Sequence, residues 1–364
     1  MRRGSMWHET AITSLLGINY PIIQAGMAGG NTTPELVAAV SNAGGLGTLG
    51  AAYMSPDSIR SAIREIRSLT KRPFAVNLLI VDDRHEAKPD DVDAMEKQLK
   101  QLELEIGASL SFADLSLNPP SFSEQLKVVI EEEVPIFSFA FGIPSSKQLE
   151  ALKRKGTKII GTATTVEEAK VLEAKGVDAI VAQGSEAGGH RGTFAHTFET
   201  GMVGLMALVP QMVDQVNSPV VASGGIMDGR GILAALMLGA AGVQMGTAFL
   251  TTTESGAHPS YKAAIQQSDD VSTVVTRAFS GRPARGIRNT FIERIEGQGI
   301  KIPEYPVQNA LTQEIRGIAK KTNNPEWMSL WSGQAGRLAR SLSAKLLMEE
   351  LIEDVSVRIK DFYQ

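Results

Sequence analysis

Short apolar runs alternate with amphipathic helical patterns along most of the chain, and this alternation constrains the fold more than any other feature of the sequence. Eight runs are predicted as strands, at residues 20–24, 46–49, 74–79, 135–139, 158–162, 179–183, 219–223 and 242–245. Helical patterns lie between them, at residues 34–42, 56–68, 123–133, 146–154, 165–175, 203–216 and 229–238. Strands that alternate with helices form parallel sheets. Eight such units, several flanked by Gly or Pro, predict an α/β fold with a closed (β/α)8 TIM barrel rather than an open doubly wound sheet.

Two segments depart from this repeating unit. The first, residues 81–120, is a polar and acidic insertion after the third strand, with a helical pattern around residues 91–105. The second follows Thr251 and carries helical patterns near residues 259–267, 307–320 and 336–359. We therefore expect three parts: a leader with a cloning remnant at residues 1–10, a barrel at 11–251, and a C-terminal helical extension at 252–364 that caps the active face.

The composition excludes several classes of function. The 36 Lys and Arg against 40 Asp and Glu give a formal net charge of -4, so there is no chain-wide basis for binding nucleic acid or an anionic membrane. The absence of cysteine excludes a disulfide framework, a Cys-ligated metal centre and a thiol nucleophile, and it favours a cytoplasmic location. Residues 231–253 carry no charge, but glycines and a glutamine interrupt them, which favours a buried helix and strand over a membrane span.

Small-residue turns end both of the last two predicted strands. The seventh strand runs into Gly224 and Gly225, and the eighth ends in Gln244-Met245-Gly246-Thr247. In TIM barrels these two loops commonly hold phosphate, and glycine lets backbone N–H groups approach an anion, here at the start of the helix that begins at Gly229. Such turns can also simply end strands tightly. The occurrence of two together favours a cradle for the phosphate of a flavin mononucleotide.

The loop after the sixth strand, residues 183–192, is the most informative stretch of the chain. It has four glycines within nine residues, and His190 lies among them. A histidine at the end of a barrel strand can act as a general base or donate a hydrogen bond to a developing anion. A lone histidine is more often structural, but this position favours a catalytic one. Among His, Asp and Glu no grouping has metal-ligand spacing, so no metal is expected.

Three further polar features have competing interpretations. Asn77, at the end of the third strand, is placed to hydrogen-bond the edge of a cofactor ring, although it could cap a turn. For Glu186, bracing its own loop or pairing with an arginine is favoured over a catalytic role. A local basic cluster in the tail is interpreted as ion pairing or anion steering near the active face. It comprises Arg277, Arg282, Arg285, Arg288 and Arg294.

The motifs in these segments resemble those of the nitronate monooxygenases, formerly called 2-nitropropane dioxygenases, and the resemblance covers residues 12–338. In the barrel it is carried by residues 20–27 (YPIIQAGM), 44–47 (GGLG), 74–77 (FAVN), 183–192 (QGSEAGGHRG), 223–229 (SGGIMDG) and 244–247 (QMGT). In the tail, residues 279–286 (FSGRPARG), 305–309 (YPVQN) and 328–334 (MSLWSGQ) are similar to the bacterial class of that family.

The resemblance implies an FMN-dependent enzyme on a TIM barrel, with His190 as the catalytic residue and Met27 near the isoalloxazine ring. It also implies flavin contacts from Asn77, Gln183, Gly188, Gly224, Gly225, Gln244, Met245, Gly246 and Thr247. The family oxidises alkyl nitronates such as propionate 3-nitronate with O2, giving a carbonyl compound and nitrite, which is a detoxifying reaction. The expected partners are therefore small molecules, and whether the chain forms a homo-oligomer stays open.

Two other functions stay in competition. An FMN-dependent enoyl-acyl carrier protein reductase is similar in its Glu-Ala-Gly-Gly-His loop and Gly-Gly turn, so the barrel motifs do not separate the two. The tail motifs favour the monooxygenase, and no dedicated nicotinamide-binding domain can be read from the sequence. A non-catalytic flavin-binding barrel is the other, because fold does not prove activity. Related barrels that need a cysteine nucleophile are excluded, because the chain has none.

Overall fold

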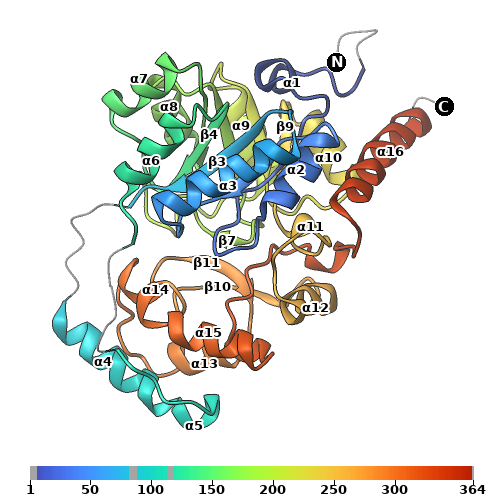
Figure 1. Cartoon of the computed structure of the whole chain (residues 1–364). Coiled ribbons are helices and arrows are strands. Elements are labelled where there is room, and N and C mark those ends of the chain that lie inside the picture. The colour runs from blue at the N-terminus through green and yellow to red at the C-terminus, as the bar shows by residue number, and fades with distance from the viewer. Residues whose placement is uncertain (1–5, 82–87, 113–118, 363–364) are drawn as a thin grey trace.

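Eight parallel strands form the barrel that the sequence predicts (Figure 1). The computed structural model describes residues 6–81, 88–112 and 119–362. The barrel strands are β1 (Ile22–Gln24), β2 (Gly47–Gly50), β3 (Phe74–Leu79), β4 (Ile136–Ala140), β5 (Lys158–Ala163), β6 (Ala179–Gln183), β8 (Val220–Ser223) and β9 (Gly242–Met245). Their order is β1-β9-β8-β6-β5-β4-β3-β2, and a parallel bridge between Ile23 and Leu46 joins β1 to β2 and closes the ring.

Helices surround the barrel and begin where the sequence supplies caps. They are α2 (Pro34–Asn42), α3 (Pro56–Leu69), α6 (Phe122–Glu131), α7 (Ser146–Arg154), α8 (Val166–Ala174), α9 (Leu205–Val213) and α10 (Gly229–Met237). In α3 the Ser55 side chain accepts the N–H of Ser58, and Pro56 occupies the first turn, where its missing N–H costs nothing. Ile59, Ile63 and Ile66 recur at helical spacing and are buried against the sheet.

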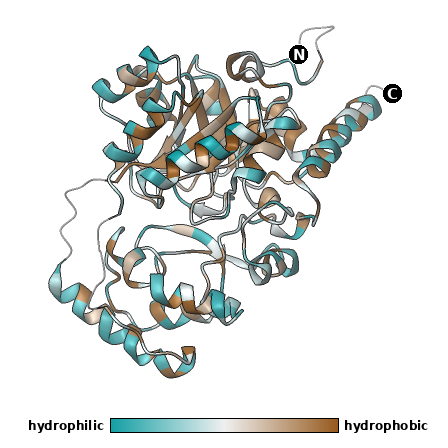
Figure 2. Cartoon of the chain, viewed as in Figure 1, coloured by the Kyte–Doolittle hydropathy of each residue, from teal (hydrophilic) through white to brown (hydrophobic). Residues whose placement is uncertain are grey.

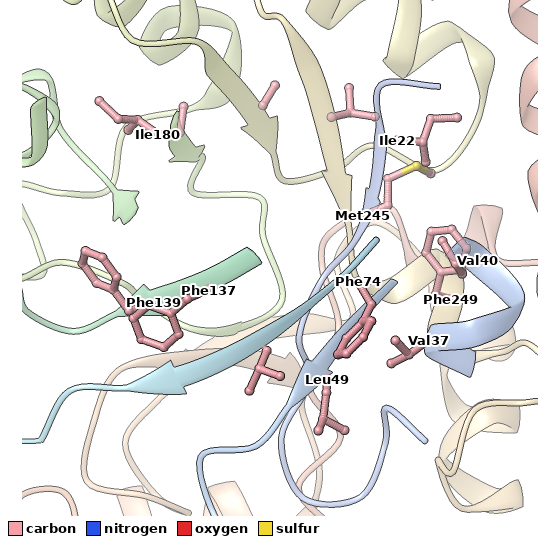
Figure 3. Packing of buried hydrophobic residues seen from close by; sticks show 14 of the residues in the cluster. Ile22, Val37, Val40, Leu49, Phe74, Phe137, Phe139, Ile180, Met245 and Phe249 are labelled. Atoms are coloured by element: carbon pink, nitrogen blue, oxygen red, sulfur yellow. The ribbon is translucent and has the colours of Figure 1, made fainter. Parts of the chain in front are cut away.

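The alternation of side chains along each strand divides the core into two layers. Outward-facing residues such as Val76, Phe137 and Ile180 share one buried cluster with apolar residues of the surrounding helices. Figure 3 labels Phe137 and Ile180 in this cluster. Inward-facing residues such as Ala75 and Ile136 fill the barrel interior together with the helix α1 (Ala11–Leu16). In Figure 2 the strands are mostly brown, and the helices around them alternate teal and brown.

The inward-facing positions become polar at the carboxyl ends of the strands. Two residues beyond the apolar interior layer, these positions hold Asn77, Ser138, Thr162, Gln183, Ser223 and Gln244. Because every second side chain of a strand points to the same face, these six side chains form a polar ring next to the apolar interior layer. The site therefore lies at the end of the barrel where TIM-barrel enzymes carry their active sites.

The insertion and the tail fold together below the barrel in Figure 1. They consist of α4 (Pro89–Gln101), α5 (Glu103–Ile106), α12 (Pro259–Gln267), β10 (Thr273–Thr276), β11 (Ala284–Ile287), α13 (Thr290–Glu296), α14 (Val307–Leu311), α15 (Gln313–Lys321) and the 3-10 turn η1 (Pro325–Trp327). Met95 and Leu99 of the insertion share a hydrophobic cluster with Phe291 and Ile315 of the tail. The Gln98 side chain also donates to the Arg294 carbonyl at 3.0 Å. Residues 1–5 of the predicted leader and residues 82–87 and 113–118 of the insertion lie outside the described residues.

The tail contains strands that the helical prediction missed. β10 and β11 pair antiparallel, and β11 pairs with β7 (Gly189–His190), so that Ala284 lies opposite His190. The predicted helix at residues 336–359 is instead a 3-10 turn, η2 (Gly336–Leu338), followed by α16 (Ala344–Phe362), which packs on α2 and α10. We use "the extension" for residues 252–362. The division at residue 251 stays a proposal.

Residues 231–253, which carry no charge, form most of α10, then β9 and the short helix α11 (Thr247–Leu250). Over the described ranges, no helix combines the length and the apolarity that a bilayer crossing requires. The interpretation of this stretch as buried helix and strand is therefore confirmed.

Candidate functional site

A cleft lies at the carboxyl ends of the barrel strands. It is lined by every residue that the sequence assigned to the site. These are Met27, Asn77, Gln183, Gly188, His190, Gly224, Gly225, Gln244, Met245, Gly246 and Thr247. They come from the loops after β1, β6 and β8, from β7, from the ends of β3, β6 and β9, and from the residues that follow β9, so the closing of the barrel brings them together.

The polar ring supplies hydrogen-bonding groups at the floor of this cleft. Asn77 donates from Nδ2 to the Ser138 hydroxyl at 2.9 Å. The Gln183 amide holds the following loop, because it donates to the His190 carbonyl at 3.0 Å and accepts the Gly192 N–H at 2.8 Å. The Gln183 amide is thus hydrogen-bonded to the loop that follows β6. The Gln244 amide, in contrast, has no hydrogen bond to the described residues, and Gln244 lines the cleft.

The glycine turns form a concave backbone surface that fits a phosphate. Gly224 and Gly225 have φ angles of 135° and 66°, a region that side chains disfavour. Within the described residues, the N–H groups of Gly224, Gly225 and Gly246 have no acceptor. Gly246 also immediately precedes α11, the short extra helix at which TIM barrels commonly hold phosphate. The cradle therefore has free donors where an anion would lie.

The start of α10, which the sequence suggested as part of this cradle, is already filled. The Gly229 N–H donates at 2.8 Å to Oδ2 of Asp354, a residue of α16. The N–H groups of Arg230 and Gly231 donate to the Asp228 carboxylate, the N-cap of the helix. That expectation was wrong, because two carboxylates of the chain itself satisfy the positive end of α10.

His190 lies at the side of the cleft, enclosed by aromatic rings. The centroids of Trp331, Phe141 and Tyr305 are 5.4, 5.6 and 6.1 Å from the centroid of its imidazole. Its Nε2 lies 2.8 Å from the Ser280 hydroxyl. Burial first, and then the nearby charges of Arg282 and Arg316, lower the pKa of His190 to about 3. The imidazole is therefore neutral at physiological pH.

Two guanidinium groups give this side of the cleft a positive potential. The Cζ atom of Arg282 lies 3.8 Å from the centroid of the Phe141 ring, a cation–π contact. Arg316 donates to the Asn309 carbonyl at 2.5 Å. Burial lowers the pKa of Arg282 to about 10, which leaves it protonated at neutral pH. Among the described residues, no carboxylate forms an ion pair with either guanidinium, although neither side chain lines the cleft itself.

The predicted basic cluster of the tail has several separate roles. Only Arg282 lies beside His190, while the exposed Arg294 pairs with Glu105 at 3.1 Å. The Arg285 side chain donates to the Ser185 carbonyl at 3.0 Å, and so holds the loop after β6. Glu186 accepts the Leu205 N–H at 2.8 Å, which confirms that it braces its own loop.

The sequence analysis did not assign several residues that surround His190. Tyr53 and Phe141 line the cleft from the barrel, and Trp331 lines it from the extension. Phe141 has a φ of 79°, which is strained for a bulky side chain and is typical of functional sites. The tail closes over the cleft through the Gly333 N–H, which donates to the Thr247 hydroxyl at 3.0 Å. Of these lining residues, Trp331 lies in a family motif, residues 328–334, whereas Tyr53 and Phe141 lie in none of the motifs.

A TIM barrel with unpaired backbone N–H groups at its glycine turns, a ring of polar side chains and a neutral histidine is typical of flavin-dependent oxidoreductases. Within the described segments, no three His, Asp or Glu side chains are grouped to hold a metal ion. A family model described as nitronate monooxygenase matches residues 9–354. The chain belongs to the nitronate monooxygenase family and is an enzyme of that family.

Individual relatives agree with this family. The chain is 50% identical over 350 residues to a protein named "Probable nitronate monooxygenase" from Staphylococcus saprophyticus, covering 96% of this chain and 98% of the relative. Among solved structures, it is similar to nitroalkane oxidase from Streptomyces ansochromogenes, with a TM-score of 0.88 and 39% identity over 97% of this chain and all of the other. It is also similar to FabK from Thermotoga maritima, with a TM-score of 0.76 and 35% identity over 97% of this chain and 98% of the other.

Proposed function

We propose that the protein is an FMN-dependent nitronate monooxygenase of the cytoplasm that converts alkyl nitronates such as propionate 3-nitronate, with O2, into a carbonyl compound and nitrite. Such a reaction would detoxify the nitronate. The observation that carries the proposal is the neutral His190, which lines the cleft, with the guanidinium groups of Arg282 and Arg316 close behind it and paired with no carboxylate of the described residues. A neutral donor flanked by positive charge suits a substrate that is already an anion.

The cleft fits FMN through groups of the chain itself. The backbone N–H groups of Gly224, Gly225 and Gly246 would bind its phosphate, with the Thr247 backbone beside them. The ring would lie against Met27, Gly188 and Met245, with its polar edge towards Asn77, Gln183 and Gln244. When bound, the flavin would accept electrons from the nitronate and deliver them to O2.

The remaining work of the site is to bind and orient the substrate. The positive charges of Arg282 and Arg316 would attract the nitronate, and the aromatic rings of Phe141, Tyr305 and Trp331 would exclude water around it. For a neutral nitroalkane a base must first remove the α-proton, and in the described part of the cleft His190 is the imidazole placed to do so. The neutral state of His190 leaves one ring nitrogen free to accept that proton.

The likeness to FabK favours one alternative, an FMN-dependent enoyl-acyl carrier protein reductase. Its thioester substrate carries no charge at the reacting carbons, so the two unpaired guanidinium groups would have no partner there. The higher TM-score of nitroalkane oxidase also favours nitronate chemistry. A flavin-binding barrel without activity would show no turnover with either kind of substrate.

The experiment is an absorbance spectrum of the purified protein, followed by O2 uptake and nitrite release on addition of propionate 3-nitronate. We expect a flavin spectrum, uptake and nitrite, with NADPH alone giving neither. Acid release of the flavin and chromatography would then distinguish FMN from larger flavins. A flavin that is reduced by NADPH and unaffected by nitronate would make the reductase the better proposal.

A further inference from the structure

Ser280, in the turn between β10 and β11, contacts the ring of His190 directly. Its hydroxyl oxygen lies 2.8 Å from His190 Nε2, and its side chain is 1% exposed. Nothing in the chemistry described above uses this hydroxyl. Its other two neighbours are backbone groups of Arg282, whose carbonyl lies at 3.1 Å and whose N–H lies at 3.3 Å.

The number of protons in this cluster determines which ring nitrogen of His190 carries its hydrogen. A serine hydroxyl has one proton to donate and can accept two. The Arg282 carbonyl can only accept, so the hydroxyl donates to it and accepts from the Arg282 N–H. With that proton donated to the carbonyl, a hydrogen bond between Ser280 and His190 requires Nε2 to be the protonated nitrogen. The neutral ring then has its lone pair on Nδ1.

Nδ1 is open to the cleft. Among the described residues it has no hydrogen-bond partner, and it is not one of the fully buried polar atoms without a partner. Nδ1 therefore keeps some accessible surface. His190 itself lines the cleft. The Nε2 side of the ring is thus tied to the extension, and the Nδ1 side is free to meet a substrate.

We propose that Ser280 is a positioning residue that holds His190 as the Nε2–H tautomer and so makes Nδ1 the atom that accepts the α-proton of a neutral nitroalkane. This inference rests on the proposed function. In that step the C–H bond breaks, its electron pair moves into the nitronate group, and the proton forms a bond to Nδ1. The resulting imidazolium still donates from Nε2 to Ser280.

The backbone around Ser280 is held rigidly, which a positioning role requires. The Arg277 carbonyl accepts the Gly281 N–H at 2.8 Å. Two side chains of α14 and its C-terminal cap bind the next two carbonyls of the turn. Gln308 donates to the Ala278 carbonyl at 2.7 Å, and Thr312 donates to the Phe279 carbonyl at 2.6 Å. A Cβ atom on Gly281, which has a φ of 81°, would come within 2.2 Å of the Pro303 carbonyl, so this turn requires glycine.

The test compares Ser280→Ala with Ser280→Thr, which keeps a hydroxyl. Ser272→Ala is the matched control, because Ser272 lies in the same segment and its hydroxyl donates to Asp269. The first readout is the 15N NMR spectrum of the histidine side chains in the flavin-bound enzyme, with the His190 signals assigned from the His190→Asn variant. We expect the Nε2–H tautomer in the natural protein, in Ser280→Thr and in Ser272→Ala, and a mixture of tautomers in Ser280→Ala.

The second readout separates proton abstraction from nitronate oxidation. We expect kcat/KM of Ser280→Ala to fall about tenfold or more with a neutral nitroalkane and less than about threefold with its preformed nitronate, since one hydrogen bond to a functional group is lost. Ser280→Thr should recover most of that loss. An Nδ1–H signal in the natural protein, or equal losses with both substrates, would overturn the proposal. If nitronate turnover is absent but the tautomers behave as expected, the proposed function fails and the positioning role stands.

Discussion

At the cleft, the barrel contributes the glycine turns, the polar ring and the rings of Tyr53 and Phe141, whereas the extension contributes Trp331 and places charged side chains behind His190. The glycine turns after β8 and β9 and the polar ring belong to the barrel, and Ser280, Arg282, Tyr305, Arg316 and Trp331 belong to the extension. His190 lies at the contact between the two, because β7 is paired with β11. We infer from this difference that the barrel would bind the cofactor, while the extension would set the charge, the tautomer and the surroundings of His190.

The largest expected effect lies at His190, where both regions meet. His190→Asn should retain flavin and lose about 100-fold or more of kcat/KM with a neutral nitroalkane, because general base catalysis commonly contributes at least that factor. The loss with preformed nitronate should be smaller. Steady-state O2 uptake with both substrate forms measures this, and unchanged activity on both would remove His190 from the mechanism.

A carboxylate in the glycine turns should weaken cofactor binding by the barrel and leave the contribution of the extension unchanged. Gly225→Asp places a negative charge beside the expected phosphate, at a φ of 66°. We expect the dissociation constant for FMN to rise about tenfold or more, with little change in kcat of the loaded enzyme. Gly239→Asp is the control, because Gly239 has a φ of 98° but lies in the exposed turn after α10. Equal FMN affinity in Gly225→Asp and Gly239→Asp would argue against the cradle.

Loss of a positive charge from the extension should weaken substrate binding and leave cofactor binding unchanged. In Arg282→Met the guanidinium over Phe141 is removed, so we expect KM for an anionic nitronate to rise about tenfold while the FMN spectrum stays the same. Arg288→Met is a matched control, because Arg288 is exposed. The rise in KM should shrink for a nitronate without a second negative charge. A loss of flavin in Arg282→Met would contradict the division between the regions.

The smallest effect concerns stability against pH. Burial lowers the pKa of His190 in the folded protein to about 3, while an unfolded histidine titrates near 6.5. Below pH 6.5 the unfolded chain therefore binds a proton that the folded chain does not, and stability falls as the pH drops from about 6.5 towards 3. His190→Asn should lose less Tm than the natural protein between pH 7 and pH 5. An identical Tm loss in both proteins would indicate that His190 is not buried in its neutral form.

The sequence predicts the barrel well because its units are local. A strand such as β6 or a helix such as α7 is fixed by hydrophobic periodicity and caps within about ten residues, and both have the bounds that the sequence predicts. The glycine turns and His190 could be found for the same reason, since they follow directly from strand ends.

The extension is harder to predict because its contacts are between distant residues. β10 and β11 are four residues each, and β11 contains Arg285, which is buried by its bonds to Ser185 and Thr273 rather than by hydrophobic character. Ser280 reaches His190 from 90 positions away. Likewise, Asp354 fills the start of α10 from 125 positions away, and no local pattern could signal that carboxylate.

The measurement that tests this division most directly is a double-mutant cycle between Gly225→Asp and Arg282→Met, followed as kcat/KM for a nitronate at saturating FMN. If the barrel binds the cofactor and the extension binds the substrate, the two losses should multiply to within about twofold, because independent sites are additive in free energy. A combined effect that differs from the product by about tenfold or more would contradict the account.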